Sequence, residues 1–85
     1  MDYDAFKQGL AERLTKAIDM IERGMAHHGT PVSRRRVIAF VWRHWLKKMA
    51  IDRAKDPARL SEDEWQHRLA IFAEVMQELE RKASN

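Results

Sequence analysis

The chain has 85 residues, with 16 lysines and arginines against 13 aspartates and glutamates, and no cysteine. At this length one domain buries only about 60 to 65% of its unfolded surface, so a monomer is expected to be modestly stable and to gain from self-association. The lack of cysteine excludes disulfides, thiol nucleophiles and cysteine-based zinc sites.

Apolar residues recur at three- and four-residue steps through the first third of the sequence. The series consists of Tyr3, Phe6, Leu10, Leu14, Ala17, Ile21 and Met25. This spacing places them on one face of a helix and predicts a helix over about residues 4–28. Gly29 supplies its stop signal.

A second helix is predicted over about residues 31–55. Pro31 suits the first helical position and disfavours helical geometry at the residue before it, which makes Thr30 the expected N-cap. Ser33 is the alternative N-cap. Pro57 disfavours helical geometry at the preceding residue and so ends the helix near residue 55.

The third helix, predicted over about residues 62–82, has the clearest start signal. Ser61 and Glu64 have the spacing of a capping box, and Leu60 and Trp65 fit the hydrophobic staple across it. The apolar seam that follows contains Trp65, Leu69, Phe72, Met76 and Leu79.

The whole pattern predicts an all-α fold, with residues 1–85 forming a single helical domain. Three helices with short connections pack most simply as an antiparallel three-helix bundle, which we expect to dimerise. The tryptophans and most methionines fall on the apolar seams and are expected in the core.

The 31–55 helix carries more apolar surface than two neighbours can cover. One broad face contains Ile38, Val41, Trp42, Trp45, Leu46 and Met49, which suffices for packing. A second side carries Val37, Phe40, His44 and Ile51. These residues are either buried because the helix buries most of its circumference, or ordinary exposed apolar groups, or a contact surface for a second copy or another partner.

The same helix lies in the basic part of the sequence. Residues 30–60 carry nine lysines and arginines against two aspartates. With Thr30 as N-cap, Arg34, Arg35 and Arg36 would lie at the end of the first turn and beyond. There the unfavourable effect of the helix dipole on cations fades. The cations could pair with the acidic 62–82 helix, contact phosphates or lie on anionic lipid.

Sequence motifs give little support for catalysis. The glycines are scattered, and the few hydroxyl residues form no Ser-His-Asp constellation, so we expect no enzyme, cofactor or small-molecule substrate. Glu64 and His67 have the Glu-x-x-His spacing of carboxylate-bridged metal sites. Glu64 is expected to serve the cap and His67 lies off the seam, so no metal site is predicted.

Two hypotheses for function follow. The preferred one is a non-enzymatic interaction or regulatory protein, expected to be a homodimer, that docks on a partner protein through the 31–55 helix. Its predicted contact residues are Val37, Phe40, His44, Ile51, Arg36, Arg43 and Lys47. The alternative is a nucleic-acid-binding regulator. Its predicted phosphate contacts are Arg34, Arg35, Arg36, Arg43, Lys47 and Lys48.

The sequence also bears on location. It begins Met1-Asp2-Tyr3-Asp4, without the features of a secretion signal, and its longest uninterrupted apolar run covers residues 37–42. A membrane-spanning helix needs about 20 such residues. We therefore expect a cytoplasmic protein with no membrane span.

Overall fold

The computed structural model describes residues 2–84 and contains three α-helices in that range. Helix α1 spans Tyr3–His27, α2 spans Arg34–Lys55 and α3 spans Glu62–Ala83. Residues 2–84 contain no β-strand, so the all-α prediction with three helices is confirmed. Within the same residues, no helix has the length and hydrophobicity needed to cross a membrane.

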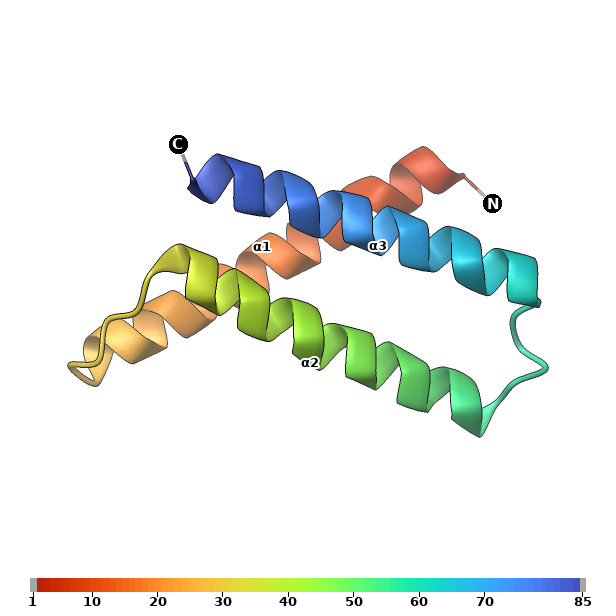
Figure 1. Ribbon diagram of the computed structural model, residues 1–85, viewed down its shortest axis with the longest axis horizontal. Coiled ribbons are helices and arrows are strands. Elements are labelled where there is room, and N and C mark those ends of the chain that lie inside the picture. Colours follow the sequence, from red (N-terminus) through yellow and green to blue (C-terminus); the bar gives the residue numbers. More distant parts are fainter. Residues whose placement is uncertain (1, 85) are drawn as a thin grey trace.

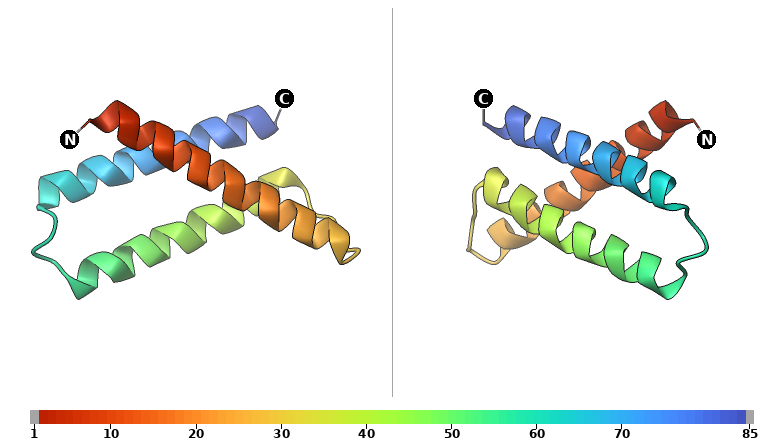
Figure 2. Two further views of the ribbon diagram at one scale, coloured as in Figure 1. Left: turned by 180° about the vertical axis from the view of Figure 1, so that it is seen from behind. Right: turned by 45° about the vertical axis from the view of Figure 1, so that its right-hand side comes forward.

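The helices form a flattened body of 44 × 26 × 16 Å. Figures 1 and 2 show α2 and α3 side by side, with α1 lying obliquely across both of them. All three pairs of helices are in contact. The oblique course of α1 limits the length over which it can cover both neighbours.

The connection between α1 and α2 explains why α2 begins later than the sequence predicted. Gly29 has a φ of 73°, its N–H donates to the carbonyl of Ala26 over 3.1 Å, and the N–H of Thr30 donates to the carbonyl of Met25 over 2.9 Å. These two bonds form a Schellman motif at the end of α1. Thr30 therefore belongs to the C-terminal cap of α1 and does not start α2.

Ser33, the alternative in the sequence, is the N-cap of α2. Its Oγ accepts a hydrogen bond from the backbone N–H of Arg36 over 3.3 Å, and its backbone is extended. The prediction of Thr30 as N-cap and of a helix start at residue 31 was wrong. As a consequence, the three arginines occupy the first turn of α2, where the helix dipole disfavours cations most.

The start of α3 agrees with the sequence, but its capping box is only half formed. The Oγ of Ser61 accepts from the backbone N–H of Glu64 over 3.1 Å. The Glu64 carboxylate does not serve the cap as predicted, because it accepts hydrogen bonds from the Tyr3 hydroxyl and from Nε of Arg68. Glu64 thereby links α3 to the first residue of α1.

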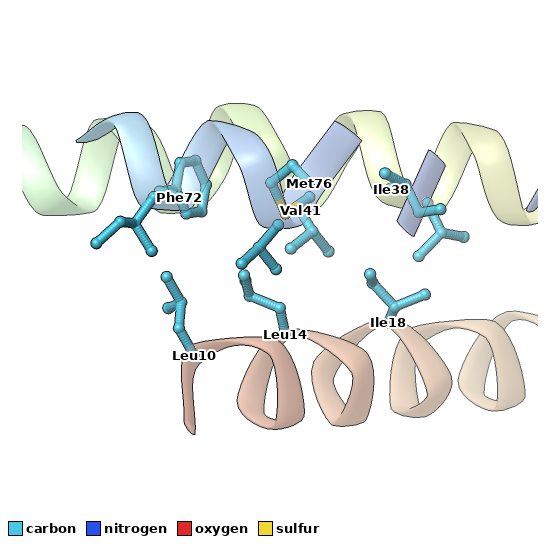
Figure 3. Close-up of a cluster of buried hydrophobic side chains, with 10 residues drawn as sticks. Leu10, Leu14, Ile18, Ile38, Val41, Phe72 and Met76 are labelled. Carbon is cyan, nitrogen blue, oxygen red and sulfur yellow. The ribbon is translucent and has the colours of Figure 1, made fainter. Parts of the chain in front are cut away.

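The core lies where α1 crosses the other two helices (Figure 3). Its buried residues are Leu10, Leu14, Ile18, Val37, Ile38, Val41, Ile71, Phe72, Val75 and Met76. Among them, Ile71 and Val75 are not part of the predicted apolar seam of α3. They are buried because α1 and α2 together cover a wider strip of α3 than one seam.

The core does not extend along the whole of α2 and α3. Residues 42–55 of α2 and 62–70 of α3 contain no fully buried side chain. In Figure 1 these two halves diverge toward their connection at residues 56–61. Leu46, predicted to lie on the core face, is 41% exposed because it falls in this diverging half.

Candidate functional site

The outer face of α2 is an exposed line of cationic and apolar side chains. We define it by the residues Arg36, Phe40, Arg43, His44, Lys47 and Ile51, all of which are exposed. Most follow one another at three- and four-residue steps, so they lie on one side of the helix. The buried residues Ile38 and Val41 lie on the other side.

The apolar part of this face centres on Phe40 and Ile51. Their side chains are 52% and 46% exposed. The rings of Phe40 and His44, one helical turn apart, stack with their centroids 5.9 Å apart and their planes 9° from parallel. The two stacked rings present a flat aromatic surface beside the cations.

Val37 does not belong to this face. It is only 2% exposed and packs in the core. It lies one turn before the buried Val41 and belongs to the same buried cluster as residues of α1 and α3. Its assignment to the contact surface is therefore corrected, and Val37 is a core residue.

Arg34 is bound within the chain. Its Nη1 lies 2.8 Å from Oδ1 of Asp19, and it also pairs with Glu22, so α2 begins against two acids of α1. The hydrogen bond that Arg34 donates to Asp19, followed by the one to Glu22, raises the pKa of its guanidinium despite its partial burial. Of the predicted phosphate contacts, Arg34 alone forms ion pairs within residues 2–84.

Most cations of α2 have no acidic partner within residues 2–84. Helix α2 contains eight lysines and arginines and one aspartate. Within residues 2–84, one ion pair joins it to α3, from Arg53 to Glu62 over 3.0 Å. No ion pair within the same residues involves Arg35, Arg36, Arg43, Lys47, Lys48 or Lys55.

Three other acids of α3 pair with residues outside α2. Glu74 pairs with Lys7 of α1 over 2.7 Å, and Glu78 lies within 3.7 to 3.9 Å of Arg81 and Lys82 in its own helix. Glu64 pairs with Arg68 over 3.0 Å. The alternative in which α3 neutralises the basic surface of α2 therefore holds for Arg53 alone among the described residues.

The Glu-x-x-His pair of α3 packs against the N-terminal end of α1. Tyr3 donates its hydroxyl to Glu64, and its ring stacks on His67 with centroids 3.9 Å apart. The hydrogen bond from Tyr3, then that from Arg68, lowers the pKa of Glu64, and the same bond to Glu64 raises the pKa of Tyr3. Residues 2–84 contain no cluster of three or more side chains suited to a metal ion.

Two further apolar side chains are exposed outside the predicted contact residues. Met20 of α1 is 59% exposed, and Leu46 extends the apolar surface of α2 beyond its outer face. Met20 lies beside the apolar series of its helix, which was the signal for its exposure. Leu46 gave no such signal, because its exposure results from the divergence of α2 and α3.

Comparisons of this chain with protein-family models, with curated proteins and with solved structures found no match.

Proposed function

We propose that this chain is a non-enzymatic interaction or regulatory protein that docks on an acidic protein partner through the outer face of α2. The observation that carries the proposal is the combination of exposed Phe40 and Ile51 with cations that have no acidic partner within residues 2–84. Arginines and aromatic residues are enriched among the side chains that dominate binding energy. Unpaired cations beside them favour association with an acidic surface and suppress basic partners.

A second copy of the chain fits the outer face of α2 less well than an acidic partner does. Direct pairing of two α2 helices would bring Arg36, Arg43 and Lys47 of both copies together, and like charges in an interface are costly. The homodimer expected from the sequence, like the antiparallel packing of the helices, stays a prediction. Light scattering in solution measures the mass of the protein and so tests the homodimer prediction.

Site-specific cross-linking tests the docking proposal and captures the partner in the same experiment. Phe40 is replaced by photoreactive benzoylphenylalanine, and the matched control carries the same group in place of Gln77, an exposed residue of α3. In the native cells, position 40 should cross-link to another protein with an acidic surface, and position 77 should not. The substitutions Arg43→Glu and Lys47→Glu should abolish these products.

Several outcomes would overturn the proposal. They are products formed equally from positions 40 and 77, products that contain only a second copy of this chain, and products that contain only nucleic acid. Because Phe40 and Ile51 are exposed, the double variant Phe40→Glu, Ile51→Glu should keep its helical circular dichroism and its melting temperature. Unfolding of this variant would mean that the two side chains have a structural role.

Nucleic-acid binding is the second candidate, and the same unpaired cations favour it. Arg35, Arg36, Arg43, Lys47 and Lys48 remain as candidate phosphate contacts once Arg34 is paired with α1. Each phosphate that a cation neutralises releases counterions, so binding would weaken steeply between about 50 and 200 mM salt. Titration of labelled duplex and single-stranded nucleic acid at both salt concentrations tests this candidate, and no binding at the lower concentration would end it.

A further inference from the structure

A groove lies between the three helices where α2 and α3 diverge. Its volume is about 260 Å³. It lies along residues 42–55 of α2 and 62–70 of α3, which contain no fully buried side chain. The outer face of α2 and this groove share no residue, which makes them independent candidates for binding.

The groove is lined mainly by apolar side chains from all three helices. Phe6 and Leu10 come from α1, Trp45 and Met49 from α2, and Trp65 and Leu69 from α3. Five of these six are only partly buried, and Leu10 alone is fully buried. Concave apolar surface of this kind gains free energy when an apolar ligand replaces the water in it.

Charged groups of both signs line the groove, and two of its arginines are available to an anion. The lining includes the guanidinium groups of Arg13, Arg53, Arg59 and Arg68 and the carboxylates of Asp52 and Asp56. Arg68 is engaged by Glu64, and Arg53 by Glu62. Arg59 and Arg13 form no ion pair within residues 2–84, and both are exposed, so they are available to an anionic head group.

Arg53 has a hydrogen-bond donor at the groove that lacks an acceptor within the described residues. Its guanidinium lies over the ring of Trp65 with Cζ 5.2 Å from the centroid, and its Nη2 donates to Glu62. Its Nε is buried and has no hydrogen-bond partner within the described residues. An unpaired buried donor is unfavourable, and an acceptor brought into the groove would relieve this cost after a small shift of the side chain.

We propose that this groove binds a small amphiphile with one apolar chain or ring and one carboxylate head group. The volume lies just below the range of about 300 to 1,000 Å³ that is usual for drug-sized ligands, so a single short chain is the appropriate size. The chain lies between Trp45 and Trp65, and the carboxylate accepts hydrogen bonds from Arg59. A planar guanidinium can hold a carboxylate through two parallel hydrogen bonds.

The three tryptophans allow a direct test with octanoate as the probe and octanol as its uncharged counterpart. Trp45 and Trp65 line the groove, whereas Trp42 packs edge-on against Phe72 at a centroid distance of 6.4 Å and does not line it. In heteronuclear NMR spectra, octanoate should shift the indole N–H signals of Trp45 and Trp65 and leave that of Trp42 nearly unchanged. Octanol should bind more weakly.

Variants with opposite expected effects test the head-group site. Arg59→Gln should weaken octanoate binding about two- to fivefold, as expected for loss of an exposed charge pair. Asp56→Asn should strengthen it, because a like charge is removed from the groove. The matched control, Arg43→Gln on the outer face of α2, should leave the affinity unchanged.

The results that would overturn this inference are distinct from those that bear on the outer face. They are the absence of shifts at Trp45 and Trp65, equal binding of octanol and octanoate, or weaker binding in Asp56→Asn. An equal loss in Arg43→Gln and Arg59→Gln would also overturn it, since it would place octanoate on the cationic surface of α2. Circular dichroism of each variant confirms that its helices are intact.

Discussion

Arg34, the first residue of α2, lies 2.8 Å from Asp19 of α1, measured from Nη1 to Oδ1. The contact places a cation at the helix end where the dipole disfavours it, and two acids of α1 compensate for that position. It also ties the start of α2 to α1 just beyond their connection. Within residues 2–84, the basic sequence at residues 34–36 thus forms ion pairs at its first arginine and none at the other two.

A double-mutant cycle should measure this contact. Arg34→Gln alone is expected to change stability little, because loss of the ion pairs is offset by relief from the helix dipole. The cycle of Arg34→Gln with Asp19→Asn should give a coupling free energy of about 0.5 kcal/mol, typical of a half-exposed pair. Urea unfolding at low and high salt measures it, and the coupling should fall as salt screens the charges.

The control for that cycle combines Arg34→Gln with Glu12→Gln. Glu12 is an exposed acid of α1 that forms no ion pair within residues 2–84. Its coupling to Arg34 should be close to zero. Equal coupling to Asp19 and Glu12 would show that only the general charge of α1 matters.

The two candidate caps of α2 can be separated by one small side-chain change each. Ser33→Ala removes the acceptor of the Arg36 N–H and should lower stability by about 1 kcal/mol. For a domain of this size that loss lowers the melting temperature by about 4 to 8 °C. Thr30→Ala should have little effect, since the role of Thr30 in the Schellman motif uses its backbone N–H. If calorimetry showed a larger loss of stability for Thr30→Ala than for Ser33→Ala, Thr30 would be the N-cap of α2.

Two leucine substitutions test where the core ends. Leu14→Ala, at a fully buried position of α1, should cost about 2 to 5 kcal/mol through lost burial and the cavity left behind. Leu46→Ala, at an exposed position of α2, should cost less than about 0.5 kcal/mol. Denaturant unfolding of both variants compares the same chemical change at two depths, and similar losses would mean that the diverging half of α2 is as well packed as the core.

Local sequence signals predicted the helices because each depends on neighbouring residues. The cap at Ser61 and the end of α2 near residue 55 follow from spacings of a few residues, and both agree with the structure. The prediction of Thr30 as the N-cap of α2 failed because the same residue type can cap the end of one helix or the start of the next. The choice was made by Gly29, whose positive φ completes the cap of α1.

The candidate site depends on distances that the sequence does not contain. Val37 and His44 are two turns apart and lie near one side of α2, yet Val37 is buried and His44 is exposed. The difference arises because the neighbouring helices approach one end of α2 and diverge from the other. A helical wheel shows the direction of each side chain around the helix but not its position along the axis. It therefore grouped these two residues together.

The contact of Tyr3 with Glu64, 61 residues apart in the sequence, leads to a prediction about pH. Tyr3→Phe should raise the pKa of Glu64 toward its ordinary value, because the hydrogen bond from Tyr3 is the main cause of its lowering. Titration of the Glu64 side-chain carboxyl by carbon NMR measures this. Lys7→Gln is the control, since it breaks another link between α1 and α3, the Lys7–Glu74 pair, and should leave the Glu64 titration unchanged.

The same contact should make stability depend on pH at both ends of the range. A lowered carboxyl pKa contributes stability above the unfolded value of 4.5, and this contribution is lost as the pH falls through the folded pKa. The raised pKa of Tyr3 means that stability falls as the pH rises from 10.0 through the folded value. Tyr3→Phe should therefore lose stability near neutrality, approach the parent protein in acid and lack the alkaline decrease due to Tyr3. Melting temperatures measured as a function of pH test this. A difference between variant and parent that stays constant across the whole pH range would contradict the contact.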